Sequence, residues 1–145
     1  MRRVLLAAAA LSIPISGLAV GLSSPAWAAV KITCKSVTGT ETGTTTLSVC
    51  TGGNTGGSSH PLSSSVLATG GTINWISGST TTVGAPKLKA TSAKKCPVAG
   101  SSADKFTATV TGDTGDGLKV KGKAAGAVCL APSGAITALK PLTFT

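Results

Sequence analysis

The sequence has few of the residues on which catalytic and metal sites depend. Its 145 residues include no tyrosine, one histidine and four acids, and only two tryptophans and two phenylalanines. We expect three of the acids, Glu41, Asp113 and Asp116, at solvated turns; the fourth acid is Asp104. His60 lies between a Gly/Ser tract and a proline, which predicts an exposed loop. No Gly-x-Ser-x-Gly elbow or phosphate-binding glycine motif is present. We therefore expect no enzyme activity, no catalytic residue, no cofactor and no metal site.

Negative charge is scarce as well, and arginine is absent after residue 3. Beyond residue 28 the chain carries eleven lysines and four acids, a formal net charge of +7. A surface of this kind attracts anionic polymers. Nucleic acid is not an expected partner, because this part of the chain has no arginine and too few aromatic side chains for base stacking.

The longest apolar stretch lies at the N-terminus. A basic start precedes an apolar segment over residues 4–22, which a proline and a glycine interrupt, and Ala-Trp-Ala follows at 26–28. This pattern is typical of a cleaved secretory signal peptide, whereas a spanning helix needs about 20 uninterrupted apolar residues. We predict a signal peptide over 1–28 and a single secreted β domain over 29–145. We expect this domain outside the cell or at the cell envelope, with no transmembrane span.

Helix-favouring patterns are nearly absent, and Thr, Val and Ile alternate with Gly and Ser clusters. We predict an all-β fold, a small antiparallel β-sandwich or barrel built from hairpins, with two disulfides supporting a core of few large side chains. The predicted strand pairs and closing strands are 30–38 with 44–50, 71–76 with 80–84, 106–111 with 118–130, and finally 135–139 and 142–145.

Two of these hairpins have registers that follow from their apolar faces. Turning the second hairpin about Gly78 pairs Ile73 with Val83 and Trp75 with Thr81, which makes Trp75 the largest core residue. The loop before this hairpin, residues 51–65, is polar and rich in glycine, and we expect a mobile surface loop.

The third hairpin shows the clearest alternation of apolar and polar residues. Matching its apolar faces pairs Val110 with Leu118 and leaves a three-residue loop at 113–115. The second strand then continues to Leu130, and we expect both of its faces to be buried near that end.

Four cysteines allow three pairings. Folding the first hairpin about residue 42 places Cys34 opposite Cys50, where a cross-strand disulfide is possible. In the register of the third hairpin, Cys129 would face residue 99, close to Cys96. We therefore expect the disulfides Cys34–Cys50 and Cys96–Cys129. A zinc site is not expected, because there is no Cys-x-x-Cys and His60 is the only histidine.

The lysines of two predicted strands form ladders that we expect to bind anions. They are Lys119, Lys121 and Lys123 on one strand and Lys87 and Lys89 on another. The alternative is that these lysines protect strand edges and keep the protein soluble. The favoured hypothesis is a non-catalytic, secreted or envelope-associated β domain that binds an anionic envelope polymer or a partner protein.

An ordered set of short motifs suggests a family. The motifs are Ile32-Thr33-Cys34, the stretch from Thr46 to Thr51, the stretch from Gly70 to Trp75, Lys95-Cys96-Pro97, the stretch from Thr107 to Thr111, and Val128-Cys129-Leu130. Together they resemble small secreted β proteins of actinobacteria, most of them without an assigned function. The resemblance implies export, two disulfides and an all-β fold, and it transfers no site residue.

Two alternative functions remain open from the sequence. The size, the export and the disulfide spacing are similar to those of subtilisin-inhibitor-type proteins. In that case Lys94-Lys95-Cys96-Pro97 would be the reactive loop beside a disulfide. The surrounding motifs differ from those of that family. The second alternative is a subunit of an oligomeric envelope pore, because a single chain lacks the aromatic girdles of a barrel in a membrane. The sequence leaves the oligomeric state undetermined.

Overall fold

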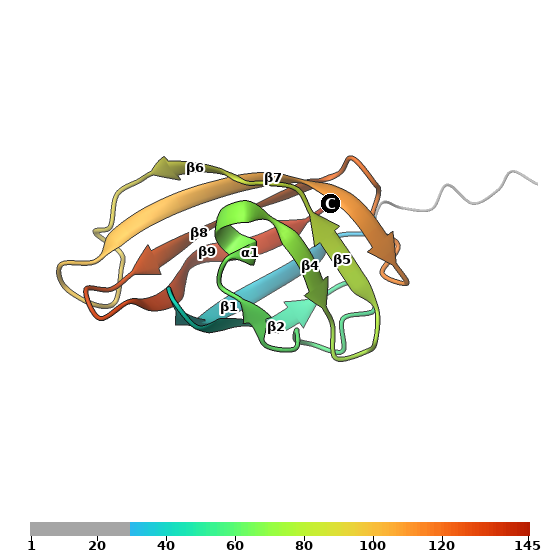
Figure 1. The fold of residues 1–145 in the computed structure, drawn as a ribbon, viewed down its shortest axis with the longest axis horizontal. Coiled ribbons are helices and arrows are strands. Elements are labelled where there is room, and N and C mark those ends of the chain that lie inside the picture. The colour runs from blue at the N-terminus through green and yellow to red at the C-terminus, as the bar shows by residue number, and fades with distance from the viewer. Residues whose placement is uncertain (1–29) are drawn as a thin grey trace, which may run out of the picture.

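The structure, a computed structural model that describes residues 30–145, is a nearly closed, barrel-like antiparallel sheet (Figure 1). The predicted signal peptide over 1–28 lies outside the described residues. The elements are β1 (Ile32–Thr40), β2 (Thr44–Thr51), β3 (Leu62–Ser63), α1 (Val66–Thr69), β4 (Gly71–Asn74), β5 (Thr80–Val83), β6 (Lys87–Ala90), β7 (Ser102–Thr114), β8 (Lys123–Leu130) and β9 (Ala135–Phe144). The all-β prediction is confirmed, and of its two architectures the barrel is the one found.

The strands follow one another in the order β3-β2-β1-β9-β8-β7-β5-β4, and β6 pairs with the first part of β7. Residues 58–60 join the two ends of this order. The bridges Ser48↔Ser58 and Ser59↔Trp75 connect β2 through this short segment to the end of β4. The described part of the chain contains no helix that is long and apolar enough to cross a bilayer.

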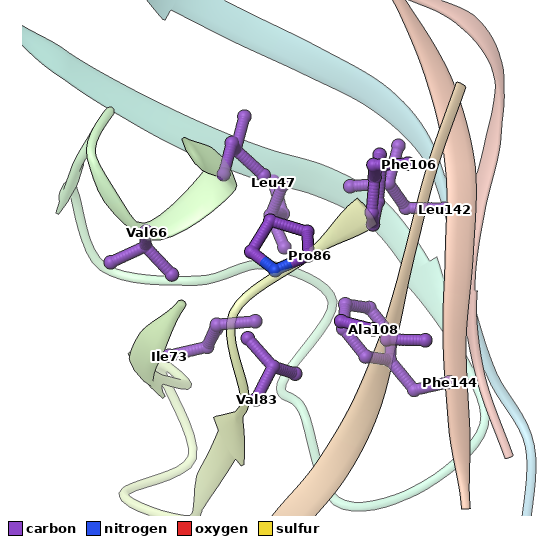
Figure 2. A pocket seen from close by; sticks show the side chains of 11 residues that line it. Leu47, Val66, Ile73, Val83, Pro86, Phe106, Ala108, Leu142 and Phe144 are labelled. Carbon is purple, nitrogen blue, oxygen red and sulfur yellow. The ribbon is translucent and has the colours of Figure 1, made fainter. Parts of the chain in front are cut away.

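The core lies inside this barrel and centres on Trp75, which is completely buried as predicted. Its indole and the ring of Phe144 pack edge to face, with ring centroids 5.9 Å apart. Beside this pair is a cavity of about 20 Å³ lined almost entirely by apolar atoms (Figure 2). Figure 2 shows side chains from β2, β4, β5, β7 and β9 converging on it, together with Val66 of α1. A cavity this small and apolar is a packing gap of the core and offers no ligand site.

The first hairpin and both disulfides agree with the sequence prediction. β1 and β2 pair with Cys34 directly opposite Cys50, and these two cysteines are bonded. The second disulfide joins Cys96 to Cys129. It holds residues 91–101 over the outer face of β7 and β8, which explains why Cys129 and Ala127 are buried on that face.

The predicted register of the second hairpin is wrong by two residues. Ile73 pairs with Thr81, not with Val83, because the turn comes one residue earlier than expected. Gly78 takes a φ of 89° and its N–H donates to the carbonyl oxygen of Trp75, which closes the turn before Ser79. Glycine at the left-handed position of a three-residue loop fixes this geometry. The shift of two keeps each side chain on its predicted face.

The predicted register of the third hairpin is wrong by four residues, since Val110 pairs with Gly122 and not with Leu118. The pairing with β8 ends near Val110, while β7 continues to Thr114, paired on its opposite edge with β5. Residues 115–122 therefore form a longer loop over the end of the barrel. Leu118 is buried in that loop, and its N–H donates to the Oδ2 of Asp113.

The glycine-rich segment 51–65 differs between its two halves: residues 51–57 form a largely exposed turn region, as predicted, whereas residues 58–65 are built into the sheet. Ser59 is buried, and its Oγ accepts a hydrogen bond from the N–H of Leu47. Thr55 and Ser64 are buried as well. The Oγ of Ser64 donates to the carbonyl oxygen of Glu41, joining the segment to the turn after β1. Small polar side chains suit this position because they satisfy backbone groups inside the barrel wall.

Candidate anion-binding face

The outer face of β6, β7, β8 and β9 carries most of the lysines. Successive residues of β7 alternate between the barrel interior and this outer face, so Phe106 is buried while Lys105 and Thr107 are exposed. In register, Lys89 lies opposite Lys105 and Lys105 lies opposite Ala127. Ala127 in turn lies opposite Lys140. One row across four strands therefore contains three lysines and an alanine.

Three hollows follow one another along this face. The first, of about 380 Å³, lies between Lys87, Lys121 and Lys123. The second, of about 240 Å³, shares Thr107 with the first and adds Lys105 and Lys140.

The third hollow has a volume of about 440 Å³ and shares Lys105 and Lys140 with the second. Lys94 and Lys95 form its far wall, and Leu139 contributes apolar surface. Since Cys96 is bonded to Cys129, the disulfide fixes the height of this wall above the sheet. We call the three hollows and the lysines that line them the lysine track; its lysines are Lys87, Lys94, Lys95, Lys105, Lys121, Lys123 and Lys140.

The predicted ladders are only partly present. Lys119 and Lys121 belong to the loop before β8, so the three-lysine ladder on one strand is wrong. The cause is the four-residue shift in register, because it places the start of β8 at Lys123 and leaves the two earlier lysines in the loop. Lys121 and Lys123 nevertheless line the first hollow beside Lys87, while Lys119 lines none of the three. Lys89 lies beside the track, opposite Lys105.

Sequence reasoning missed Lys105 and Lys140 as members of the site. Lys105 was visible in the alternating pattern of residues 105–111, where it shares a face with Thr107 and Thr109. Lys140 gave no local signal. It reaches the track through the pairing of β9 with β8, whose register shifts by a bulge on both sides of Ala127.

The acids lie away from the lysine track. Asp104 precedes Lys105 in β7 and therefore lies on the opposite face of the sheet. There it lines a groove on the inner side together with Glu41. Asp113 pairs with Thr81 at the β5 end of the barrel, close to Asp116. The positive charge of the track is therefore not neutralised by carboxylates on the same face.

Asp116 differs from the expected solvated turn residue, because it is 3% exposed. Its Oδ1 accepts hydrogen bonds from the N–H of Asn54 at 3.0 Å and the hydroxyl of Ser79 at 2.7 Å. Its Oδ2 lies 3.2 Å from the Oγ1 of Thr81, which also accepts the indole N–H of Trp75. Burial raises the pKa of Asp116 despite these bonds, and the nearby charge of Asp113 raises it further. This carboxylate joins three segments at the end of the barrel and has a structural role.

The remaining polar candidates do not assemble into a site. His60 is exposed, and its backbone N–H bonds to the carbonyl oxygen of Asn74. In residues 30–145 no three His, Cys, Asp or Glu side chains come together in a way that would hold a metal ion. The lysine track, with its concentration of positive charge, is therefore the strongest candidate for a binding site.

Comparison with protein-family models finds no match, and none is found among the curated proteins or the solved structures. The two disulfides and the all-β fold that the resemblance implied are present. The resemblance itself to secreted actinobacterial proteins stays a prediction.

Proposed function

We propose that the protein is a non-catalytic, secreted or envelope-associated domain that binds an extended anionic polymer along the lysine track. The observation that carries the proposal is the continuity of the three hollows, because neighbouring hollows share Thr107 or the pair Lys105 and Lys140. Together the hollows follow residues 105–109 of β7, about 13 Å at 3.3 Å per residue. Lys94 and Lys95 extend the track beyond it.

Several lysines in a row fit a chain of repeated negative charges better than a single small anion. Lys89 and Lys105 lie directly opposite each other, and like charges in this position destabilise a sheet. A bound polyanion removes that repulsion and releases its own counterions. Lysine is suited to such a ligand because it acts as a mobile point charge without fixed geometry.

The protease-inhibitor alternative has less support. Lys94 and Lys95 occupy a turn, closed by a hydrogen bond from the N–H of Cys96 to the carbonyl oxygen of Ala93. A protease binds a substrate-like loop as an extended strand, as in other forms of peptide recognition. Assays against serine proteases of several specificities test this alternative directly, and inhibition that is lost in Lys95→Ala would favour it.

The proposal is tested with dextran sulfate as the probe and uncharged dextran as its matched control. We expect the oxidised protein to bind dextran sulfate with an affinity that falls steeply as salt rises, and not to bind dextran. Lys105→Gln/Lys140→Gln should lower the affinity at 50 mM salt about tenfold, equivalent to about 1.4 kcal/mol.

The control variant is Lys31→Gln/Lys119→Gln, which removes the same charge from exposed positions outside the track. It should lower the affinity much less. Equal losses in the two variants would mean that net charge alone drives binding, and the proposed track would be wrong. Isolated cell envelope can then replace dextran sulfate to ask whether the natural polymer is there.

A further inference from the structure

A second, separate surface lies on the inner side of the sheet. Here an open groove of about 660 Å³ runs between β6 and the segment that contains β3 and α1. Val128, Leu130 and Ile136 line it from β8 and β9, and Leu67 and Leu88 line it from the two sides. In Figure 1, α1 covers the middle of the sheet, and β7, β8 and β9 extend past it. More than half of the Leu88 side chain is exposed, at 54%.

β6 forms one side of this groove and has a free edge. In the described part of the chain it pairs only with β7. The N–H of Thr91 donates to the carbonyl oxygen of Ala103, which shows that positions 91, 89 and 87 are the bonded ones. In an antiparallel pair the positions between them direct their N–H and C=O groups away from the partner strand. Leu88 and Ala90 therefore present unpaired backbone groups beside an apolar groove.

The charges around β6 fix the side-chain pattern that an added strand would need. Lys87 lines the outer hollow and Lys89 shares its face, whereas Leu88 lines the inner groove. Asp104 and Glu41 also line that groove. Acidic side chains are thus favoured on the outer side of an added strand and disfavoured on its inner side, where apolar side chains fit. A second copy of β6 is a poor occupant, because its lysines would lie next to Lys87 and Lys89.

We propose that the edge of β6 and the adjoining groove bind an extended segment of a partner protein by strand addition. The segment alternates apolar residues, which enter the groove, with acidic residues, which lie beside Lys87 and Lys89. Backbone hydrogen bonds to Leu88 and Ala90 hold it, as in other complexes formed at a sheet edge. This surface shares Lys87 with the lysine track, but its groove is separate and the proposal does not rest on polymer binding.

The probe is an acetylated heptapeptide with alternating valine and glutamate. Its two controls carry lysine in place of glutamate, or the same residues with the glutamates grouped at one end. We expect calorimetry at 0.3 M salt to show at least tenfold tighter binding of the alternating glutamate peptide. Amide resonances of Leu88 and Ala90 should shift during its titration. Equal binding of the three peptides would overturn the proposal, because the pattern would then not matter.

The decisive variant is Ala90→Pro, which removes an N–H that points away from β7 and should leave the fold intact. We expect it to lower peptide affinity at least tenfold, while the matched control Ala90→Thr, which keeps the N–H, should bind normally. If Ala90→Pro does not fold, Leu88→Asp serves instead, since it replaces apolar surface of the groove by a charge where the apolar side chains of the peptide enter. Unchanged binding in the folded variant would overturn the proposal.

Two further measurements separate this surface from its alternatives. Lys105→Gln/Lys140→Gln should bind the peptide normally, and a loss of peptide binding in that variant would show that the peptide lies on the lysine track. Analytical ultracentrifugation should show no dimer that is lost in the Ala90→Pro variant. Such a dimer would mean that a second copy fills the edge, and the proposed partner would be wrong.

Discussion

Replacing Lys105 by glutamine should stabilise the fold while it weakens polyanion binding. Lys105 has Lys89 directly opposite on one neighbouring strand and Lys140 two strands away on the other side. A directly opposite like-charge pair costs about 0.2–1 kcal/mol. With strands about 4.8 Å apart, Lys140 lies at about 10 Å, where two charges in water repel by about 0.4 kcal/mol. The substitution should therefore raise the free energy of unfolding by about 1 kcal/mol at low salt.

The assay is urea unfolding of the wild type, Lys105→Gln and Lys119→Gln at 10 mM and 1 M sodium chloride. Lys119→Gln is the matched control, because it removes one exposed charge from outside the track. At 1 M salt the Debye length falls to about 3 Å, so the gain from Lys105→Gln should disappear. A gain that persists at 1 M salt, or a loss of stability at 10 mM, would refute the electrostatic reasoning about this row. A gain in stability accompanied by a loss of binding is expected when residues serve a ligand and not the fold.

Three further predictions concern the framework that holds the site. Cys96→Ala/Cys129→Ala should lower the free energy of unfolding by about 4 kcal/mol, as expected for a loop of 33 residues, and urea unfolding measures this loss. The same variant should bind polyanions more weakly because it releases Lys94 and Lys95, which a dextran sulfate titration measures. The pKa of Asp116 is raised in the folded state, so its contribution to stability is fully present below its ordinary pKa of 3.8 and is lost as pH rises through the folded pKa. In a series of unfolding curves from pH 3 upward, Asp116→Asn should lack this decline in stability. An identical decline in the variant would assign it to another group. Trp75→Phe should cost about 1–3 kcal/mol because it removes both indole volume and the hydrogen bond to Thr81, and a loss below 0.5 kcal/mol would contradict the central place given to this side chain.

Local signals correctly predicted the strands that depend on their nearest neighbours in the chain. The first hairpin is such a case, since a short turn and the facing pair Cys34 and Cys50 leave one register. The burial of Trp75 followed from its apolar face and from the scarcity of other aromatic residues. The third hairpin failed because β7 runs on past its pairing with β8, up to Thr114, where β5 holds its other edge. Alternation within two strands shows which face is apolar, but it does not reveal a third strand that pairs with the other edge of one of them.

The candidate site shows the same division. The excess of lysine over acid was plain in composition, and so was the place of Lys87 and Lys89 on one strand face. The row that joins Lys89, Lys105 and Lys140 depends on pairings between strands far apart in the chain and on a bulge beside Ala127.

The sequence by itself therefore determined the all-β class, the positive charge and the positions of the four cysteines, because these depend on composition and on period-two patterns. The tertiary structure decided what lies next to what. It buried Asp116 within the loop before β8, brought seven lysines from five separate segments to one face, and left the edge of β6 open beside an apolar groove. Each of these outcomes follows from long-range strand pairing, in which a shift of a few residues changes every neighbour at little local cost.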